Sequence, residues 1–341
     1  MMKLTILLMA TFSVVLPSSM SIAATLIVAN KSDDTIDLVD PTNGASRATL
    51  PTGHAPHEVV VSPGGKLAVV SNYGDRSKAG SSLTVVDLAA AKVLRTIDLG
   101  EHTRPHGLAW LSGDRIAVTA EGSGHLLVVD TAKGKIAAAI PTGQRVSHMV
   151  AVAADRNRAF VANIGSGSVT VIDLASQKKV KDLETGAGAE GIAMSPAGGE
   201  LWVTNREADT ISVIDAATLE IRATVACAGF PIRIAFTPDG RHALVSAARS
   251  GEVVRFDAAS RKEITRKKLD LKNAPDAAQR LFGDRFGESP VPVGLVVAAD
   301  GKTAFVAATQ SDAVVVIDTE SLAVRDIIKA GHEPDGMALA K

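Results

Sequence analysis

The stretch LWVTNREADTISVID (Leu201–Asp215) decides the fold, because it holds two short β-rich runs joined by a polar turn. A third run and then a fourth follow it along the chain, and the pattern recurs every 42 residues or so. The seven copies of its second run end at Asp40, Asp87, Asp130, Asp173, Asp215, Asp257 and Asp318. Four short strands in a period of about 42 residues are typical of one propeller blade. The sequence therefore predicts an all-β chain folded as a single seven-bladed β-propeller.

The repeated aspartates are predicted to be structural rather than functional. Each one ends a strand, where its carboxylate can accept hydrogen bonds from the backbone N–H groups of the following turn. We therefore leave these aspartates out of the candidate site.

The register of the repeat also predicts how the ring closes. After residue 24 the chain begins with the second strand of a blade, and the missing innermost strand is Gly336–Ala340. Three N-terminal strands and one C-terminal strand would then complete one blade. Such closure removes the open sheet edges that invite aggregation.

The chain resembles the YVTN-type β-propeller repeat family. The resemblance is carried by VTN at Val203–Asn205, by VAN at Val28–Asn30 and Val161–Asn163, by the xVIDxxT/S turns and by the GxxPxG loop. It extends over essentially all of the chain after residue 24. It implies the propeller fold and an exported protein, but no single activity, because members of that family have varied roles.

Residues 1–24 have the pattern of a cleaved export signal. Lys3 supplies a positive start, Leu4–Leu16 is apolar, and small residues at Ser21–Ala24 form a cleavage site. The apolar run is shorter than the roughly 20 residues that a membrane-spanning helix needs, and no later run could span a bilayer. We expect a periplasmic or secreted protein in which residues 25–341 form one domain.

The composition excludes several classes of function. The chain has 36 Lys and Arg against 37 Asp and Glu, which argues against a nucleic-acid partner. Its single cysteine, Cys227, allows no intrachain disulfide and no CxxC metal framework. The GxGxxG pattern at Gly186–Gly191 precedes a strand instead of a helix, so we predict no nucleotide cofactor. A monomer is expected.

The histidines gather on one rim of the predicted ring. The loops that follow the second and the outermost strand of each blade share a rim, here named the top rim. Seven of the eight histidines fall on it, and only His242 lies on the other rim. One repeat position, which opens the innermost strand, carries in ring order Asp335, His57, His106, His148, Glu190, Ile232 and Val293.

Five neighbouring blades thus present residues that can ligate a metal at the mouth of the central channel. Three imidazoles flanked by carboxylates suit zinc first, with copper, iron or nickel as alternatives. The sequence predicts a metal site formed by His57, His106, His148, Glu190 and Asp335, with a solvated polar lining of the channel mouth as the alternative. Tyr73, Arg76, Glu121, Arg206 and Glu207 also follow second strands and are secondary candidates for this rim.

Three functions stay open from the sequence alone. The first is non-catalytic binding of a transition metal or small ligand at the channel mouth. The second is a metal-dependent hydrolase or lyase, similar to a lactonase, in which Glu190 would act as the base for a metal-bound water. The third is a platform for a protein partner on the top rim, by analogy with other propellers.

An insertion of about residues 271–292 lengthens one connection on the same rim. Ala274–Phe282 is predicted to form a short helix that stops at Gly283. Phe282 and Phe286 could pack the insertion over the channel as a lid, or could anchor a surface excursion.

Overall fold

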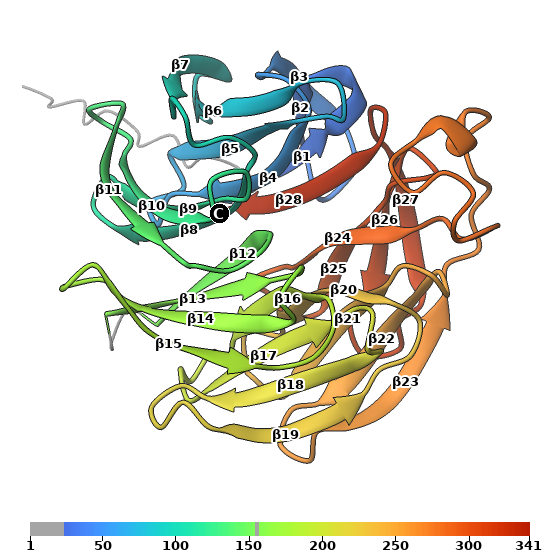
Figure 1. Cartoon of the computed structure of the whole chain (residues 1–341). Helices are drawn as coiled ribbons and strands as arrows, with labels where there is room; N and C mark the ends of the chain where they lie inside the picture. Colours follow the sequence, from blue (N-terminus) through green and yellow to red (C-terminus); the bar gives the residue numbers. More distant parts are fainter. Residues whose placement is uncertain (1–23, 154–156) are drawn as a thin grey trace, which may run out of the picture.

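Seven four-stranded antiparallel sheets surround a central axis in the computed structural model, which describes residues 24–153 and 157–341 (Figure 1). This confirms the seven-bladed β-propeller. We number the blades in ring order and give their strands from the axis outward. Blade 1 contains β28 (Pro334–Ala340), β1 (Thr25–Asn30), β2 (Thr35–Val39) and β3 (Ser46–Pro51).

The next three blades each use four consecutive strands. Blade 2 contains β4 (Pro56–Val61), β5 (Leu67–Gly74), β6 (Ala79–Asp87) and β7 (Lys92–Asp98). Blade 3 contains β8 (Pro105–Ser112), β9 (Arg115–Ala120), β10 (His125–Asp130) and β11 (Lys135–Pro141). Blade 4 contains β12 (Ser147–Ala153), β13 (Arg158–Asn163), β14 (Ser168–Asp173) and β15 (Lys178–Glu184).

The last three blades follow the same order. Blade 5 contains β16 (Ala189–Met194), β17 (Glu200–Asn205), β18 (Thr210–Asp215) and β19 (Ile221–Ala226). Blade 6 contains β20 (Pro231–Phe236), β21 (His242–Ala247), β22 (Glu252–Asp257) and β23 (Lys262–Lys268). Blade 7 contains β24 (Pro292–Val297), β25 (Thr303–Ala308), β26 (Ala313–Asp318) and β27 (Val324–Lys329).

The ring closes inside blade 1, as the register predicts. Strand β28 pairs antiparallel with β1, with Leu26 opposite Leu339 and Ile27 opposite Ala338. Figure 1 shows the two strands, red and blue, side by side. All other strand pairs join neighbours in sequence, so this pairing alone joins the two ends of the described chain.

Burial decreases from the second strand of each blade to its periphery. Every residue of β1 is buried, whereas most residues of the outermost strand β15 are exposed. The blades meet face to face through aliphatic side chains, joined by a few aromatic ones such as Trp202, which packs with Ile234 of the next blade. Cys227 belongs to the same cluster and is fully buried, and burial raises the pKa of its thiol to about 12.

The innermost strands contact one another around the whole ring, so their first residues surround the axis. The repeated aspartates end third strands and accept backbone hydrogen bonds in the turns that follow. Examples are Asp40 with the N–H of Thr42 and Asp173 with the N–H of Ser176, both within 2.9 Å. This confirms their structural role.

The predicted helix over Ala274–Phe282 is wrong. Only a single 3-10 turn, η3 (Ala277–Gln279), forms there, and a second one, η1 (Lys31–Asp33), lies in blade 1. Arg280 leaves helical geometry, and its guanidinium then reaches Asp312 at 2.6 Å and the carbonyl of Thr309 at 2.9 Å. These contacts outweigh the small gain from one more helical turn.

The export signal predicted for residues 1–24 lies outside the described residues, except for Ala24. Within the described ranges, the structure holds no helix long and apolar enough to cross a membrane.

Candidate metal centre

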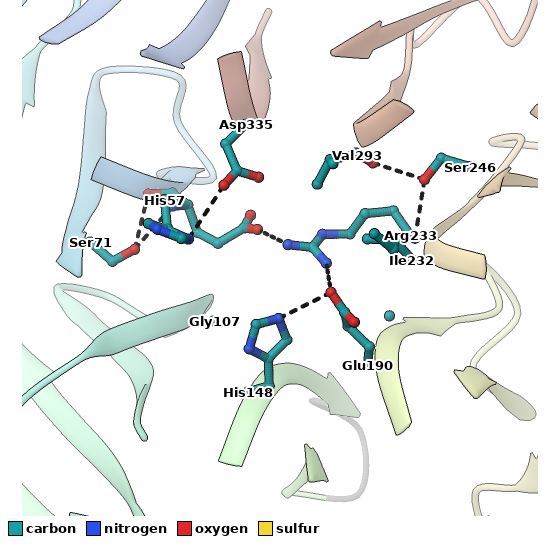
Figure 2. Close-up of polar contacts among 12 residues, drawn as sticks. His57, Ser71, Gly107, His148, Glu190, Ile232, Arg233, Ser246, Val293 and Asp335 are labelled. Carbon is teal, nitrogen blue, oxygen red and sulfur yellow. Dashed lines mark hydrogen bonds and ion pairs between the residues drawn. The ribbon is translucent and has the colours of Figure 1, made fainter. Parts of the chain in front are cut away.

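The predicted ring position opens the innermost strands at the mouth of the channel. In every blade it is the second residue of the strand, so seven side chains meet around one axis. The five predicted ligand residues are all buried there. Figure 2 shows His57, His148, Glu190 and Asp335 around this opening, with Ile232 and Val293 on its other side.

The predicted residues form a continuous row. His57 Nδ1 lies 3.3 Å from Asp335 Oδ2, and the ring centroids of His57 and His106 are 5.1 Å apart. The rings of His106 and His148 are closer still, at 3.6 Å. His148 Nε2 lies 3.4 Å from Glu190 Oε1. The repeat therefore brings together side chains that are far apart along the chain.

Three of the secondary candidates join this row. The hydroxyl of Tyr73 donates to Glu121 Oε2 at 2.6 Å, and Glu121 Oε1 pairs with His148 Nδ1. Arg206 pairs with Glu190. We name the channel-mouth cluster as the set His57, Tyr73, His106, Glu121, His148, Glu190, Arg206 and Asp335.

The other two secondary candidates lie elsewhere on the top rim. Arg76 is exposed, and Glu207 lines a surface hollow beside Gly165 and Gly188. Neither makes an ion pair with the channel-mouth cluster among the described residues.

Sequence reasoning missed two charged residues at the centre of the channel. Arg233 of blade 6 pairs with Glu58 of blade 2, on the far side of the ring. Its Nη1 lies 3.4 Å from Glu190 Oε1 (Figure 2). The third residue of the innermost strand is glycine in four blades, and Glu58 and Arg233 stand at that position. A charged residue in place of a recurrent glycine was the available signal.

Burial makes part of the cluster electrically neutral. It lowers the pKa of His57 and His106 well below the ordinary value, and the nearby cations Lys31 and His148 lower it further. Burial also raises the pKa of Asp335 to about 6. The two neutral imidazoles keep lone pairs available at physiological pH.

The opposite end of the row is charged. Burial alone would lower the pKa of His148, but the carboxylates of Glu121 and Glu190 outweigh it and raise that pKa. Burial would raise the pKa of Glu190, yet Arg206 and His148 hold it at about 2. The two carboxylates therefore favour the protonated form of His148, and Glu190 stays ionised.

One group of possible metal ligands overlaps the predicted set only in part. His106, Glu121 and His148 each offer a ligand atom, and these atoms all lie within 4.8 Å of one another. His106 Nδ1 is buried and has no hydrogen-bond partner among the described residues. Two imidazoles and a carboxylate form a common ligand set for zinc and related metals. Glu190 instead faces two arginines, and Asp335 faces His57.

The insertion packs on the apolar side of the mouth. Phe286 lies 5.0 Å from Phe230 and 5.3 Å from Phe282, measured between ring centroids. These rings share one cluster with Ile232 and Val293 of blades 6 and 7. The two phenylalanines therefore anchor the insertion, and a lid movement stays a prediction.

Comparison with known proteins gives a family and a fold. The sequence model of the YNCE-like beta-propeller family matches residues 110–281. A functionally unknown protein from Desulfotomaculum acetoxidans superposes with a TM-score of 0.74 at 15% identity, over 93% of this chain and 98% of its own. A chain of Kuenenia stuttgartiensis hydrazine synthase superposes with a TM-score of 0.69 at 20% identity, over 88% of this chain and 93% of its own.

At these identities the likeness establishes the fold alone. No curated protein matches the chain. The YVTN repeat resemblance stays a prediction, whereas membership of a β-propeller family is confirmed.

Proposed function

The chain belongs to the YNCE-like β-propeller family, and we propose that it binds a divalent transition-metal ion at the channel mouth without catalysing a reaction. The ligands are His106, Glu121 and His148. One observation carries the proposal: three ligand atoms from two neighbouring blades lie within 4.8 Å of one another in a buried setting. Three protein ligands leave one position of a tetrahedral ion for water or a small ligand.

The charges around these residues support a cation there. His106 is neutral because burial lowers its pKa, so its nitrogen is ready to donate a lone pair. A divalent ion bound by the three residues displaces one proton from His148 to solvent, so the cluster gains one positive charge overall. The buried carboxylate of Glu121 therefore keeps a counter-charge. Zinc fits this donor set first, with copper, iron and nickel as alternatives.

The state of Glu190 favours binding over hydrolysis. A general base for a metal-bound water works best with a pKa near the operating pH. The pKa of Glu190 is held at about 2, and its two oxygens face Arg206, Arg233 and His148. Such a carboxylate is a weak base, so the hydrolase or lyase alternative loses its candidate base.

Zinc analysis of the purified full chain tests the proposal. The protein is stripped with a chelator, reloaded with Zn²⁺ and passed through a desalting column, and its zinc is then measured by mass spectrometry. We expect about one ion per chain, since the described site has a single set of three ligands. His106→Ala and His148→Ala should each lose most of it.

His54→Ala is the matched control. His54 is a histidine of the same rim that pairs with Asp34 and Asp75 outside the channel-mouth cluster, and its loss should leave the zinc content unchanged. Cobalt substitution gives a second readout, because tetrahedral Co²⁺ bound by the three ligands absorbs visible light. Equal zinc content in the wild type and both channel variants would overturn the proposal.

We also propose that the protein is exported and that residues 1–24 are removed. The support is the charge, apolar run and small-residue site of that segment. The intact mass of protein recovered from the periplasm or medium should correspond to a chain that begins at Thr25. A full-length mass in the cytoplasm alone would contradict export.

A further inference from the structure

Two histidines of blade 3 face each other outside the channel-mouth cluster. His102 lies in the loop before β8, and His125 is the first residue of β10. Their ring centroids are 5.0 Å apart, and the ring planes meet at 64°. Both side chains are partly exposed on the top rim, so an ion from solvent can reach them.

One serine orients both rings. His125 Nδ1 lies 2.7 Å from the backbone carbonyl of Ser123, and His102 Nδ1 lies 2.9 Å from the hydroxyl of the same serine. A carbonyl only accepts, so His125 carries its proton on Nδ1 and its Nε2 has a free lone pair. The hydrogen bond at Nδ1 thus fixes the tautomer that a metal needs, as it does for many metal-bound histidines.

The backbone holds the two loops in register. The N–H of Glu121 donates to the carbonyl of Arg104 at 3.0 Å, and the N–H of Gly122 donates to the carbonyl of Thr103 at 3.1 Å. A Cβ on Gly122 would lie 2.0 Å from Thr103 Oγ1, so a larger residue there would require the Thr103 side chain to move. These two hydrogen bonds therefore hold the loop that carries His102 against the turn that leads to His125.

The surroundings of His102 favour its neutral form. Burial lowers the pKa of His102, and the neighbouring His125 lowers it further. A neutral imidazole is the form that binds metal. Glu101, next in the chain, adds a negative charge that favours a cation nearby.

We propose that His102 and His125 form a second, exchangeable site for a divalent transition-metal ion on the top rim. Two imidazoles bound to one tetrahedral ion at about 2.1 Å place their ring centroids about 5 Å apart, which agrees with the observed separation. In the described part of the chain, no third His, Cys, Asp or Glu groups with the pair. Water completes the coordination, so this site binds more weakly than one with three protein ligands.

This inference has its own residues and does not depend on the channel-mouth site. Calorimetric titration of the stripped full chain with Ni²⁺ tests it, because nickel binds imidazole pairs well. The wild type should show a weaker event in addition to any tight one. The double variant His102→Ala/His125→Ala should lose the weaker event, and each single variant should weaken it about tenfold or more, because one ligand of a chelating pair is gone.

His332→Ala is the matched control, because His332 is a more exposed rim histidine paired with Asp33. A second readout is the broadening of amide NMR signals by paramagnetic Ni²⁺. Signals of Ser123 and Gly124 should broaden at low Ni²⁺ in the wild type, and remain sharp in the double variant under the same conditions.

The outcomes separate the two metal sites. Loss of the weaker event in the double variant, with the tight event kept, supports the inference. If His106→Ala changes nothing while the double variant abolishes nickel binding, the channel-mouth proposal fails and this one stands. A double variant that is folded and binds nickel as the wild type does would overturn the inference.

Discussion

The two sides of the channel mouth use one backbone position in opposite ways. In blades 1 to 5 the second residue of the innermost strand is Asp335, His57, His106, His148 and Glu190. In blades 6 and 7 it is Ile232 and Val293, which pack with Phe230 and Phe286. The polar side is stabilised by pairing charges and the apolar side by excluding water. The ring therefore specifies where a side chain lies, whereas the sequence is free to place a polar or an apolar residue there.

Arg233 joins the two sides, so its loss should have the largest effect. Arg233→Met leaves the buried carboxylates of Glu58 and Glu190 without this partner. Breaking a buried ion pair by removing one partner costs about 3–5 kcal/mol. We expect urea unfolding to show a fall of that size in the free energy of unfolding.

The control is Arg249→Met, which breaks a partly exposed ion pair with Asp209 and should cost less than about 1 kcal/mol. The double variant Glu58→Gln/Arg233→Met should recover part of the loss. An Arg233→Met protein as stable as the Arg249→Met control would mean that the two sides are not electrostatically joined.

Glu190 makes the polar side sensitive to acid. Its pKa is about 2 in the folded protein against an ordinary 4.5, so its stabilising effect is present above pH 4.5 and is lost as pH falls toward 2. The shift corresponds to about 3 kcal/mol. The stability difference between wild type and Glu190→Gln should therefore be greatest above pH 4.5 and should vanish near pH 2.

Unfolding measured across this pH range checks the prediction. Ile232→Val, at the same position on the apolar side, provides the comparison, and its stability difference from wild type should not change with pH. A Glu190→Gln difference that is constant from pH 7 to 2 would contradict the assigned pairing.

Phe286 tests the apolar side. Phe286→Ala should cost about 2 kcal/mol, at or below the low end for a buried aromatic, because the ring lies at the edge of an insertion. Zinc content should stay unchanged, since the ring touches none of the proposed ligands. Leu281→Ala, an exposed residue of the same insertion, is the control and should be nearly neutral. Loss of zinc in Phe286→Ala would show that the insertion supports the metal site.

The smallest loss of stability is expected from a hydrogen bond between a threonine and a backbone carbonyl that occurs on both sides of the mouth. The hydroxyl of Thr119 donates to the carbonyl of His148 on the polar side, and that of Thr204 donates to the carbonyl of Ile232 on the apolar side. Each bond links one blade to the next. Thr119→Val and Thr204→Val should therefore cost about 1 kcal/mol each in thermal or urea unfolding. Clearly unequal losses would show that the two sides do not share a scaffold.

The repeat made most of this predictable from the sequence. A position that recurs in every blade identifies its own neighbours, so His57 could be placed beside His106 without coordinates. Ring closure could be predicted in the same way, because the strand that starts at Thr25 matches the second strand of a blade and the first strand is missing there. A repeat frame converts distance along the chain into proximity around an axis.

Glu58 and Arg233 were not predicted to line the channel, because the side chains of their strands do not alternate regularly between the two faces. Successive residues of a strand point to opposite faces, so only one of two neighbours should reach the channel. The pairing register shifts between Pro56 and Val59 and again between Pro231 and Arg233. Such a bulge turns two consecutive side chains the same way.

The sequence also could not predict Glu121 as the third ligand of the proposed site. The spacing placed Glu121 on the correct rim, but which carboxylate reaches His148 depends on the conformation of the turn after β9. Glu190, which the repeat favoured, is held by Arg206 from the equivalent turn of blade 5. Glu190 pairs with a neighbouring arginine, and this leaves Glu121 as the carboxylate of the proposed ligand set. The repeat pattern does not show such local pairing.

The pairing of β28 with β1 sets an order of events during synthesis. The ribosome synthesises β1 before the other strands and β28 after them, so blade 1 stays incomplete until the other six blades have been synthesised. Asp335 travels on that late strand, and His57 therefore gains its carboxylate neighbour only when translation of the ring is complete. A prematurely released chain would carry most of the blades but an incomplete mouth and an exposed strand edge, which invites pairing with other chains.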